Sequence, residues 1–139
     1  APREPLHLVI VAAQFGLSTP SVFKQLDAGR AAGEYPASGE LVEPVELLEA
    51  LKSYDGSEAA LASLAPLLRN DLQAPALSCA PQLEQTLNLR DSEGVYASLV
   101  SGSGPTVLLL ASSQNRAEAL ASALRDTGNH AVSAVLNHP

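Results

Sequence analysis

Residues 99–112, LVSGSGPTVLLLAS, place a short stretch of glycine and serine between two apolar runs. This arrangement is typical of a turn between antiparallel strands, and it predicts strands over 95–101 and 105–112. The same stretch also fits a loop whose backbone approaches a phosphate, because glycine leaves room beside the backbone N–H groups. The local pattern leaves both interpretations open.

The rest of the chain combines strand patterns with helical patterns. Residues 6–13, LHLVIVAA, predict a buried strand, and the alternating apolar residues of 130–136 predict a last strand. Helices are predicted over 20–28, 44–54, 56–70 and 114–128, with two short helical pieces in 70–87, a loop over 29–42 and a turn over 88–94. This order predicts one α+β domain over 1–139, with a split βαβ arrangement, a mostly antiparallel four-stranded sheet and extra helices.

Several helix ends carry local signals. Ser18 or Thr19 can cap the helix that has Pro20 in its first turn, and Ser57 can cap the helix over 56–70. Pro66 is expected to kink or end that second helix, because proline lacks the N–H that a helix interior needs.

The composition disfavours several classes of function. The chain has 15 acidic and 8 basic residues and a net charge of −7, so neither a nucleic-acid partner nor an anionic membrane surface is expected. Cys79 is the single cysteine, which rules out an intrachain disulfide and fits a cytoplasmic setting. The chain contains no methionine, so either an initiator methionine was removed or these residues are a piece of a longer protein.

The residues alone indicate little catalytic chemistry. The stretch over 102–106 lacks the third glycine of a dinucleotide-binding fingerprint and the lysine of a P-loop. The turn over 16–20 is either a plain strand-to-helix connection or a helix N-terminus that favours an anionic or polar group. His7, His130 and His138 have no metal-ligand spacing, so no metal site is expected. No arrangement of serine, histidine and aspartate is recognisable, and we name no catalytic residue.

Three stretches together resemble the C-terminal half of GHMP-superfamily kinases: GLSTPSVF at 16–23, NDLQAPAL at 70–77 and SGSGPT at 101–106. Within that superfamily they resemble the kinases that phosphorylate 4-diphosphocytidyl-2-C-methyl-D-erythritol in non-mevalonate isoprenoid biosynthesis. The preference for arginine over lysine, 6 to 2, resembles actinobacterial members. The resemblance implies a ferredoxin-like C-terminal domain, in agreement with the predicted order of elements.

The resemblance also implies roles for particular residues. Gly102, Ser103 and Gly104 would lie against the nucleotide-phosphate loop of the other half and help to shape the nucleotide cleft, where the γ-phosphate and the acceptor meet. Thr19, Pro20 and Phe23 would line the substrate side, although Phe23 equally fits the buried stripe of its helix. We assign Asn70 and Asp71 to helix capping and interdomain structure rather than to catalysis.

Cofactors and partners follow from the same resemblance. The full-length parent would use ATP and Mg²⁺, but the family's ATP-binding loop, lysine and aspartate have no match here. We therefore expect an N-terminal ATP-binding half of the same polypeptide as partner and a small-molecule substrate. The isolated chain should bind no metal and should be inactive. The alternative is a stand-alone, non-enzymatic ligand-binding module with the same fold.

Overall fold

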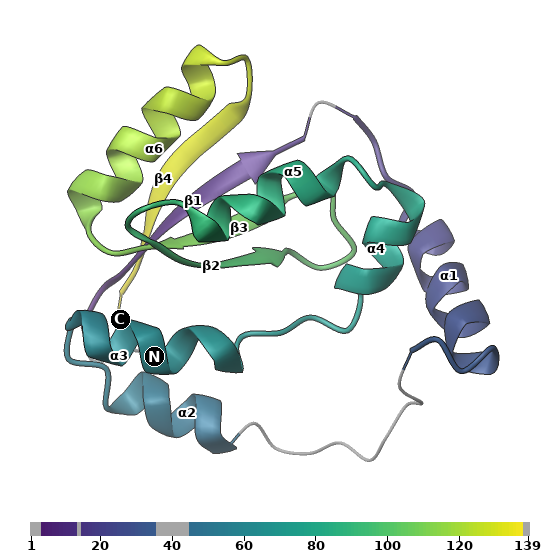
Figure 1. The fold of residues 1–139 in the computed structure, drawn as a ribbon, viewed down its shortest axis with the longest axis horizontal. Helices are drawn as coiled ribbons and strands as arrows, with labels where there is room; N and C mark the ends of the chain where they lie inside the picture. Colours follow the sequence, from purple (N-terminus) through teal and green to yellow (C-terminus); the bar gives the residue numbers. More distant parts are fainter. Residues whose placement is uncertain (1–3, 14, 36–44, 138–139) are drawn as a thin grey trace.

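The computed structural model describes residues 4–13, 15–35 and 45–137. Within them, four strands form one antiparallel sheet: β1 (Leu6–Ala12), β2 (Val95–Val100), β3 (Val107–Ala111) and β4 (His130–Leu136) (Figure 1). Their order across the sheet is β2-β3-β1-β4, so β1 and β3 are central. The predicted α+β class and antiparallel four-stranded sheet are confirmed. Part of the loop predicted over 29–42, and the start of the helix predicted over 44–54, lie outside the described residues.

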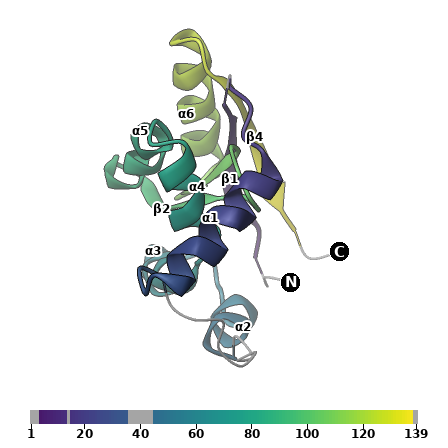
Figure 2. The same cartoon turned by 90° about the vertical axis from the view of Figure 1, so that its right-hand side faces the viewer.

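One face of the sheet carries the larger core cluster. Val9 and Val11 of β1 and Val107 and Leu109 of β3 are buried on this face, because alternate side chains of a strand point to the same side. Helix α6 (Gln114–Asp126) covers them together with α4 (Gln73–Cys79) and α5 (Leu83–Leu87). In Figure 2, α5 and α6 lie to one side of β1 and β4.

The alternate residues of the same strands build a second core cluster. Leu6 and Leu110 pack with Tyr54, Leu61 and Leu64, which belong to α3 (Glu58–Leu64) and to the segment before it. Leucines of α2 (Val45–Lys52) complete the cluster. The sheet therefore packs against apolar side chains on both faces, which explains why β1 is apolar at every position except His7.

Helix α1 (Thr19–Ala31) begins where the sequence indicates but extends further than predicted. Ser18 is its N-cap, and the Ser18 hydroxyl accepts a hydrogen bond from the backbone N–H of Ser21 at 3.3 Å. The prediction of a helix end at residue 28 is wrong, because Gly29 is a buried helical residue of α1. A Cβ at Gly29 would overlap the ring of Tyr35.

The helices between β1 and β2 follow the predicted pattern with shorter bounds. The Ser57 hydroxyl accepts a hydrogen bond from the Ala60 N–H at 3.1 Å, as predicted for a cap. The helix predicted over 56–70 ends at Leu64, because Pro66 converts the next turn into a 3₁₀ helix, η1 (Ala65–Leu67). The predicted pair of short pieces in 70–87 is confirmed as α4 and α5, and the predicted turn over 88–94 begins with a 3₁₀ helix, η2 (Asn88–Asp91).

No helix among the described residues combines the length and the hydropathy that crossing a bilayer requires.

Candidate functional site

The stretch at 101–106, which we call the glycine loop, connects β2 to β3 as a hairpin. The Ser101 N–H donates to the Thr106 carbonyl at 2.8 Å, and the Gly104 N–H donates to the Ser101 carbonyl at 2.9 Å. Gly102 and Gly104 have φ angles of +57° and +80°, a region that other residues rarely adopt. The hairpin interpretation is therefore confirmed, and the hairpin also leaves the backbone of Gly102 in open space, with nothing within 4 Å of its Cβ position.

The segment before α1 lies directly against this loop. A Cβ on Gly104 would lie 3.3 Å from the Leu17 side chain and 3.2 Å from that of Val100. The Thr19 and Ser103 hydroxyl oxygens are 3.0 Å apart and share a hydrogen bond, although the two residues are 84 positions apart in the chain. The fold thus joins two of the three stretches on which the resemblance rests.

The contact between the start of α1 and the glycine loop provides uncharged hydrogen-bonding groups. The Thr19 and Ser103 hydroxyls are partly or fully exposed, and they lie at the N-terminal end of the 13-residue helix α1, which has no acidic residue in its first turn. The Ser21 N–H is already capped by Ser18 and Pro20 has no N–H, so what favours negative charge at this end is the helix dipole. Uncharged hydroxyls and backbone amides can bind and orient a polar or anionic group, but they cannot serve as a strong base at neutral pH.

Phe23 lies one helical turn beyond Thr19 and is not part of the core. The buried residues of α1 are Val22, Leu26 and Gly29, whereas the Phe23 side chain is 47% exposed. The interpretation of Phe23 as a core residue is therefore wrong. Pro20 is exposed as well. Both residues are accessible to a ligand, and their substrate-binding role stays a prediction.

Asn70 has a different role from the one the sequence indicates. The N-cap position of α4 is Leu72, without a side-chain cap. The Asn70 Oδ1 accepts from the Leu72 N–H at 3.1 Å, while its Nδ2 donates to the Val100 carbonyl at 2.8 Å and to the Gly102 carbonyl at 2.6 Å. The capping assignment is thus corrected: Asn70 binds the glycine loop. No local signal could have shown this, because the loop partners lie 30 and 32 residues away.

Asp71 does not take part in these contacts. Its side chain is 78% exposed, and one carboxylate oxygen lies 4.0 Å from the Arg30 guanidinium. An exposed ion pair at this distance contributes little to stability. Its predicted part in interdomain structure stays a prediction.

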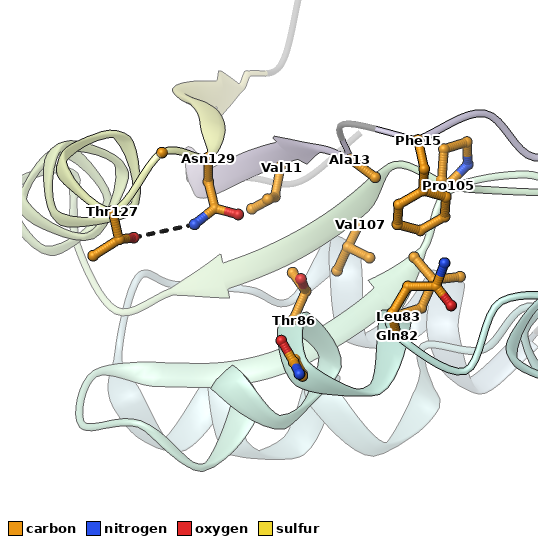
Figure 3. Close-up of a pocket in the computed structure, with 12 residues that line it drawn as sticks. Val11, Ala13, Phe15, Gln82, Leu83, Thr86, Pro105, Val107, Thr127 and Asn129 are labelled. Atoms are coloured by element: carbon orange, nitrogen blue, oxygen red, sulfur yellow. Dashed lines mark hydrogen bonds between the residues drawn. The ribbon is translucent and has the colours of Figure 1, made fainter.

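A cavity of about 330 Å³ borders the glycine loop at Pro105 (Figure 3). Phe15 and Pro105 form one wall, and Thr86 of α5 and Asn129 of the turn between α6 and β4 face it from the opposite sides. Its lining residues are apolar or carry neutral amides and hydroxyls. The cavity therefore offers shape and hydrogen bonds but no acid or base.

The shifted pKa values belong to the α2–α3 side of the molecule. Burial raises the pKa of Tyr54, with Asp55 and Glu4 raising it further, and burial together with Glu58 raises the pKa of Tyr96. Hydrogen bonds from Ser57 lower the pKa of Asp55. In the part of the chain that the structure describes, no three His, Cys, Asp or Glu side chains gather closely enough to hold a metal.

Residues 45–130 match the family model described as GHMP kinases C terminal. The chain therefore belongs to the family of GHMP kinase C-terminal domains, and the resemblance that the three motifs indicate is confirmed. In sequence it is similar to the 4-diphosphocytidyl-2-C-methyl-D-erythritol kinase of Nocardia farcinica, with 45% identity over 126 residues, covering 91% of this chain and 38% of that protein. The chain thus spans about two fifths of the length of the curated relatives that it matches.

Solved structures agree on the fold. The crystal structure of a 4-(cytidine 5'-diphospho)-2C-methyl-D-erythritol kinase superposes with a TM-score of 0.73 at 24% identity, covering all of this chain and 46% of that one. A homoserine kinase from Cytophaga hutchinsonii superposes with a TM-score of 0.61 at 15% identity, covering 95% of this chain and 41% of that one. At these identities the superpositions show a shared fold.

Proposed function

We propose that this chain is the C-terminal part of an ATP-dependent cytoplasmic kinase that phosphorylates the 2-hydroxyl of 4-diphosphocytidyl-2-C-methyl-D-erythritol. The proposal is supported by the family membership and by the 45% identity to a kinase of that name. The remaining length of such relatives would supply an N-terminal ATP-binding half. The exposed free Cys79 fits a reducing compartment.

The observation that carries the proposal is the contact between the glycine loop and the start of α1, through Thr19 and Ser103. In the proposed reaction, the 2-hydroxyl oxygen bonds to the γ-phosphorus of ATP, and the bond from that phosphorus to the β–γ bridging oxygen breaks, releasing ADP. Such a transfer depends on positioning and on stabilisation of the phosphoryl charge. The backbone of Gly102–Gly104 is suited to positioning, because it is open on the Gly102 side and fixed on the Gly104 side.

The charged groups of the reaction must come from elsewhere. We assign Thr19, Pro20 and Phe23 to the acceptor side of the cleft, where Phe23 offers an exposed apolar ring. The hydroxyl proton and the phosphoryl charge would be handled by the N-terminal half. Mg²⁺ prefers clustered carboxylate and phosphate oxygens, and the described residues provide no such cluster, so we assign no residue of this chain to it.

The proposal is tested by measuring ADP release from the intact polypeptide that contains this chain. We expect turnover with ATP and 4-diphosphocytidyl-2-C-methyl-D-erythritol, little with homoserine as the acceptor, and none with residues 1–139 alone. Turnover by the isolated chain, or a clear preference for homoserine, would contradict the proposal. Tight binding of the substrate by the isolated chain, with no turnover by the intact polypeptide, would instead support the alternative of a stand-alone binding module.

A further inference from the structure

We infer that Asn70 is a positioning residue of the proposed kinase, acting on the reaction through the backbone of the glycine loop. This inference rests on the proposed function and deepens it. We class Asn70 as a positioning residue because its side chain binds the backbone of the loop and of its own segment.

The three hydrogen bonds of Asn70 require an amide in one orientation. The Oδ1 atom accepts from the Leu72 N–H, so the Nδ2 atom is the one directed at the carbonyls of Val100 and Gly102. A carboxylate could keep the first hydrogen bond, but it would place an oxygen against two carbonyl oxygens. Asparagine therefore satisfies this position and aspartate does not.

Gln73 binds the same end of β2, at Val100, but as a hydrogen-bond acceptor where Asn70 is a donor. Its Oε1 atom accepts from the Val100 N–H at 3.0 Å. Because β2 is an edge strand, the outward-facing N–H and C=O of Val100 have no neighbouring strand, and Gln73 and Asn70 take the place of one. At Gln73 a carboxylate would keep the acceptor, so glutamate is expected to substitute without loss.

The hydrogen bond to the Gly102 carbonyl matters most because packing does not hold that residue. Nothing lies within 4 Å of its Cβ position, whereas Gly104 is enclosed by Val100 and Leu17. A glycine with an open surface has wide conformational freedom. The Gly104 N–H to Ser101 carbonyl bond closes the turn around Gly102, and Asn70 ties the Gly102 carbonyl to the end of β2, which sets the direction of the neighbouring loop amides.

The matched pair Asn70→Asp and Gln73→Glu tests this role, since each replaces an amide by a carboxylate beside the same strand end. In the intact polypeptide, we expect Asn70→Asp to lower kcat by about tenfold or more, because small displacements of positioning groups are costly. The KM of the acceptor should change less than kcat. Gln73→Glu should keep kcat within about threefold, since its hydrogen bond is retained.

A second readout does not depend on kinase activity. Amide hydrogen exchange at Gly104, whose N–H bonds to the Ser101 carbonyl, should become at least about tenfold faster in Asn70→Asp and stay unchanged in Gln73→Glu. Both variants are compared well below their unfolding midpoints, so that global unfolding does not contribute. Equal effects of the two substitutions, or unchanged loop exchange in Asn70→Asp, would overturn the inference. If the unsubstituted polypeptide shows no kinase activity but the exchange difference appears, the proposed function fails while Asn70 still holds the loop.

Discussion

Gly102 and Gly104 are separated by one residue, and both have a positive φ, but they meet different surroundings. A residue with a side chain at either position would have to adopt a backbone conformation that costs ordinary residues about 1–2 kcal/mol. At Gly104 the added methyl group would also press on the Val100 and Leu17 side chains at 3.2 and 3.3 Å, whereas at Gly102 it would enter open space. Comparing substitutions at the two glycines therefore separates the effect of side-chain packing around the loop from the effect of the loop backbone itself.

We predict that Gly104→Ala lowers the free energy of unfolding of this chain by about 2–4 kcal/mol, and Gly102→Ala by about 1 kcal/mol. Urea unfolding followed by circular dichroism measures both values. Gly128→Ala is the matched control, because Gly128 has a φ of +90° and nothing within 4 Å of its Cβ position. A loss at Gly104 no larger than that at Gly128 would show that Leu17 does not pack against the loop.

Residues with local partners could be predicted from the sequence, and residues with distant partners could not. Ser18 and Ser57 cap helices through N–H groups three positions away; the sequence indicates Ser57, and it indicates Ser18 as one of two candidates with Thr19. Asn70 resembles a cap in sequence, but its decisive partners are 30 and 32 positions away. Phe23 was ambiguous because it follows the buried Val22 directly, and only the orientation of α1 shows that it is exposed.

Among the elements, helices α2 and α3 pack against the sheet through a hydrophobic cluster that contains an ionisable side chain, Tyr54. Tyr54 lies between these helices, is 2% exposed, and packs with the cluster of Leu6, Leu61, Leu64 and Leu110. Burial raises the pKa of its phenol, and the charges of Asp55 and Glu4 add to the effect. The folded state therefore retains the Tyr54 proton to higher pH than the unfolded state does.

This difference predicts a loss of stability at alkaline pH. The stability linked to Tyr54 is complete below about pH 10, the ordinary pKa of tyrosine, and it is lost as the pH rises toward the raised pKa of the folded state. Between pH 9 and 11, Tyr54→Phe should show a smaller decrease in the free energy of unfolding than the unsubstituted chain. The remaining decrease belongs in part to Tyr96, whose pKa is also raised. Identical decreases in the two proteins would contradict the burial of this phenol.

The sequence predicts the type and order of the elements well, and it predicts the residues at which they end less well. The strand and helix order is as predicted, since apolar periodicity reports which face of each element is buried. The sequence places the start of the loop over 29–42 too early, because Gly29 is still helical and makes room for the Tyr35 ring. The helix predicted over 56–70 was too long because the apolar periodicity continues through Pro66 after the hydrogen-bond pattern has changed.

At the scale of the whole molecule, the split βαβ order brings two distant loops to one end of the sheet. The chain leaves β1 toward α1 at the same end at which the hairpin joins β2 to β3, because β1 and β3 are antiparallel neighbours. Figure 1 shows α1 and α4 gathered at this end and the connection of α2 to α3 at the other. The order of elements could be predicted from the sequence, but the contact of Thr19 with Ser103 depends on a register that no local pattern reveals.

We propose that this end of the sheet forms one wall of a phosphoryl-transfer cleft. Paramagnetic broadening in the intact polypeptide, with ¹⁵N-labelled glycine and Mn²⁺·ATP in place of Mg²⁺·ATP, measures how close the glycine loop lies to the bound nucleotide. Gly102→Ala and Gly104→Ala identify the two loop resonances, and Gly56, between α2 and α3, is the internal reference. We expect Mn²⁺·ATP to broaden the Gly102 and Gly104 resonances and to leave the Gly56 resonance sharp. Loop resonances as sharp as that of Gly56, in a polypeptide saturated with Mn²⁺·ATP, would contradict this proposal.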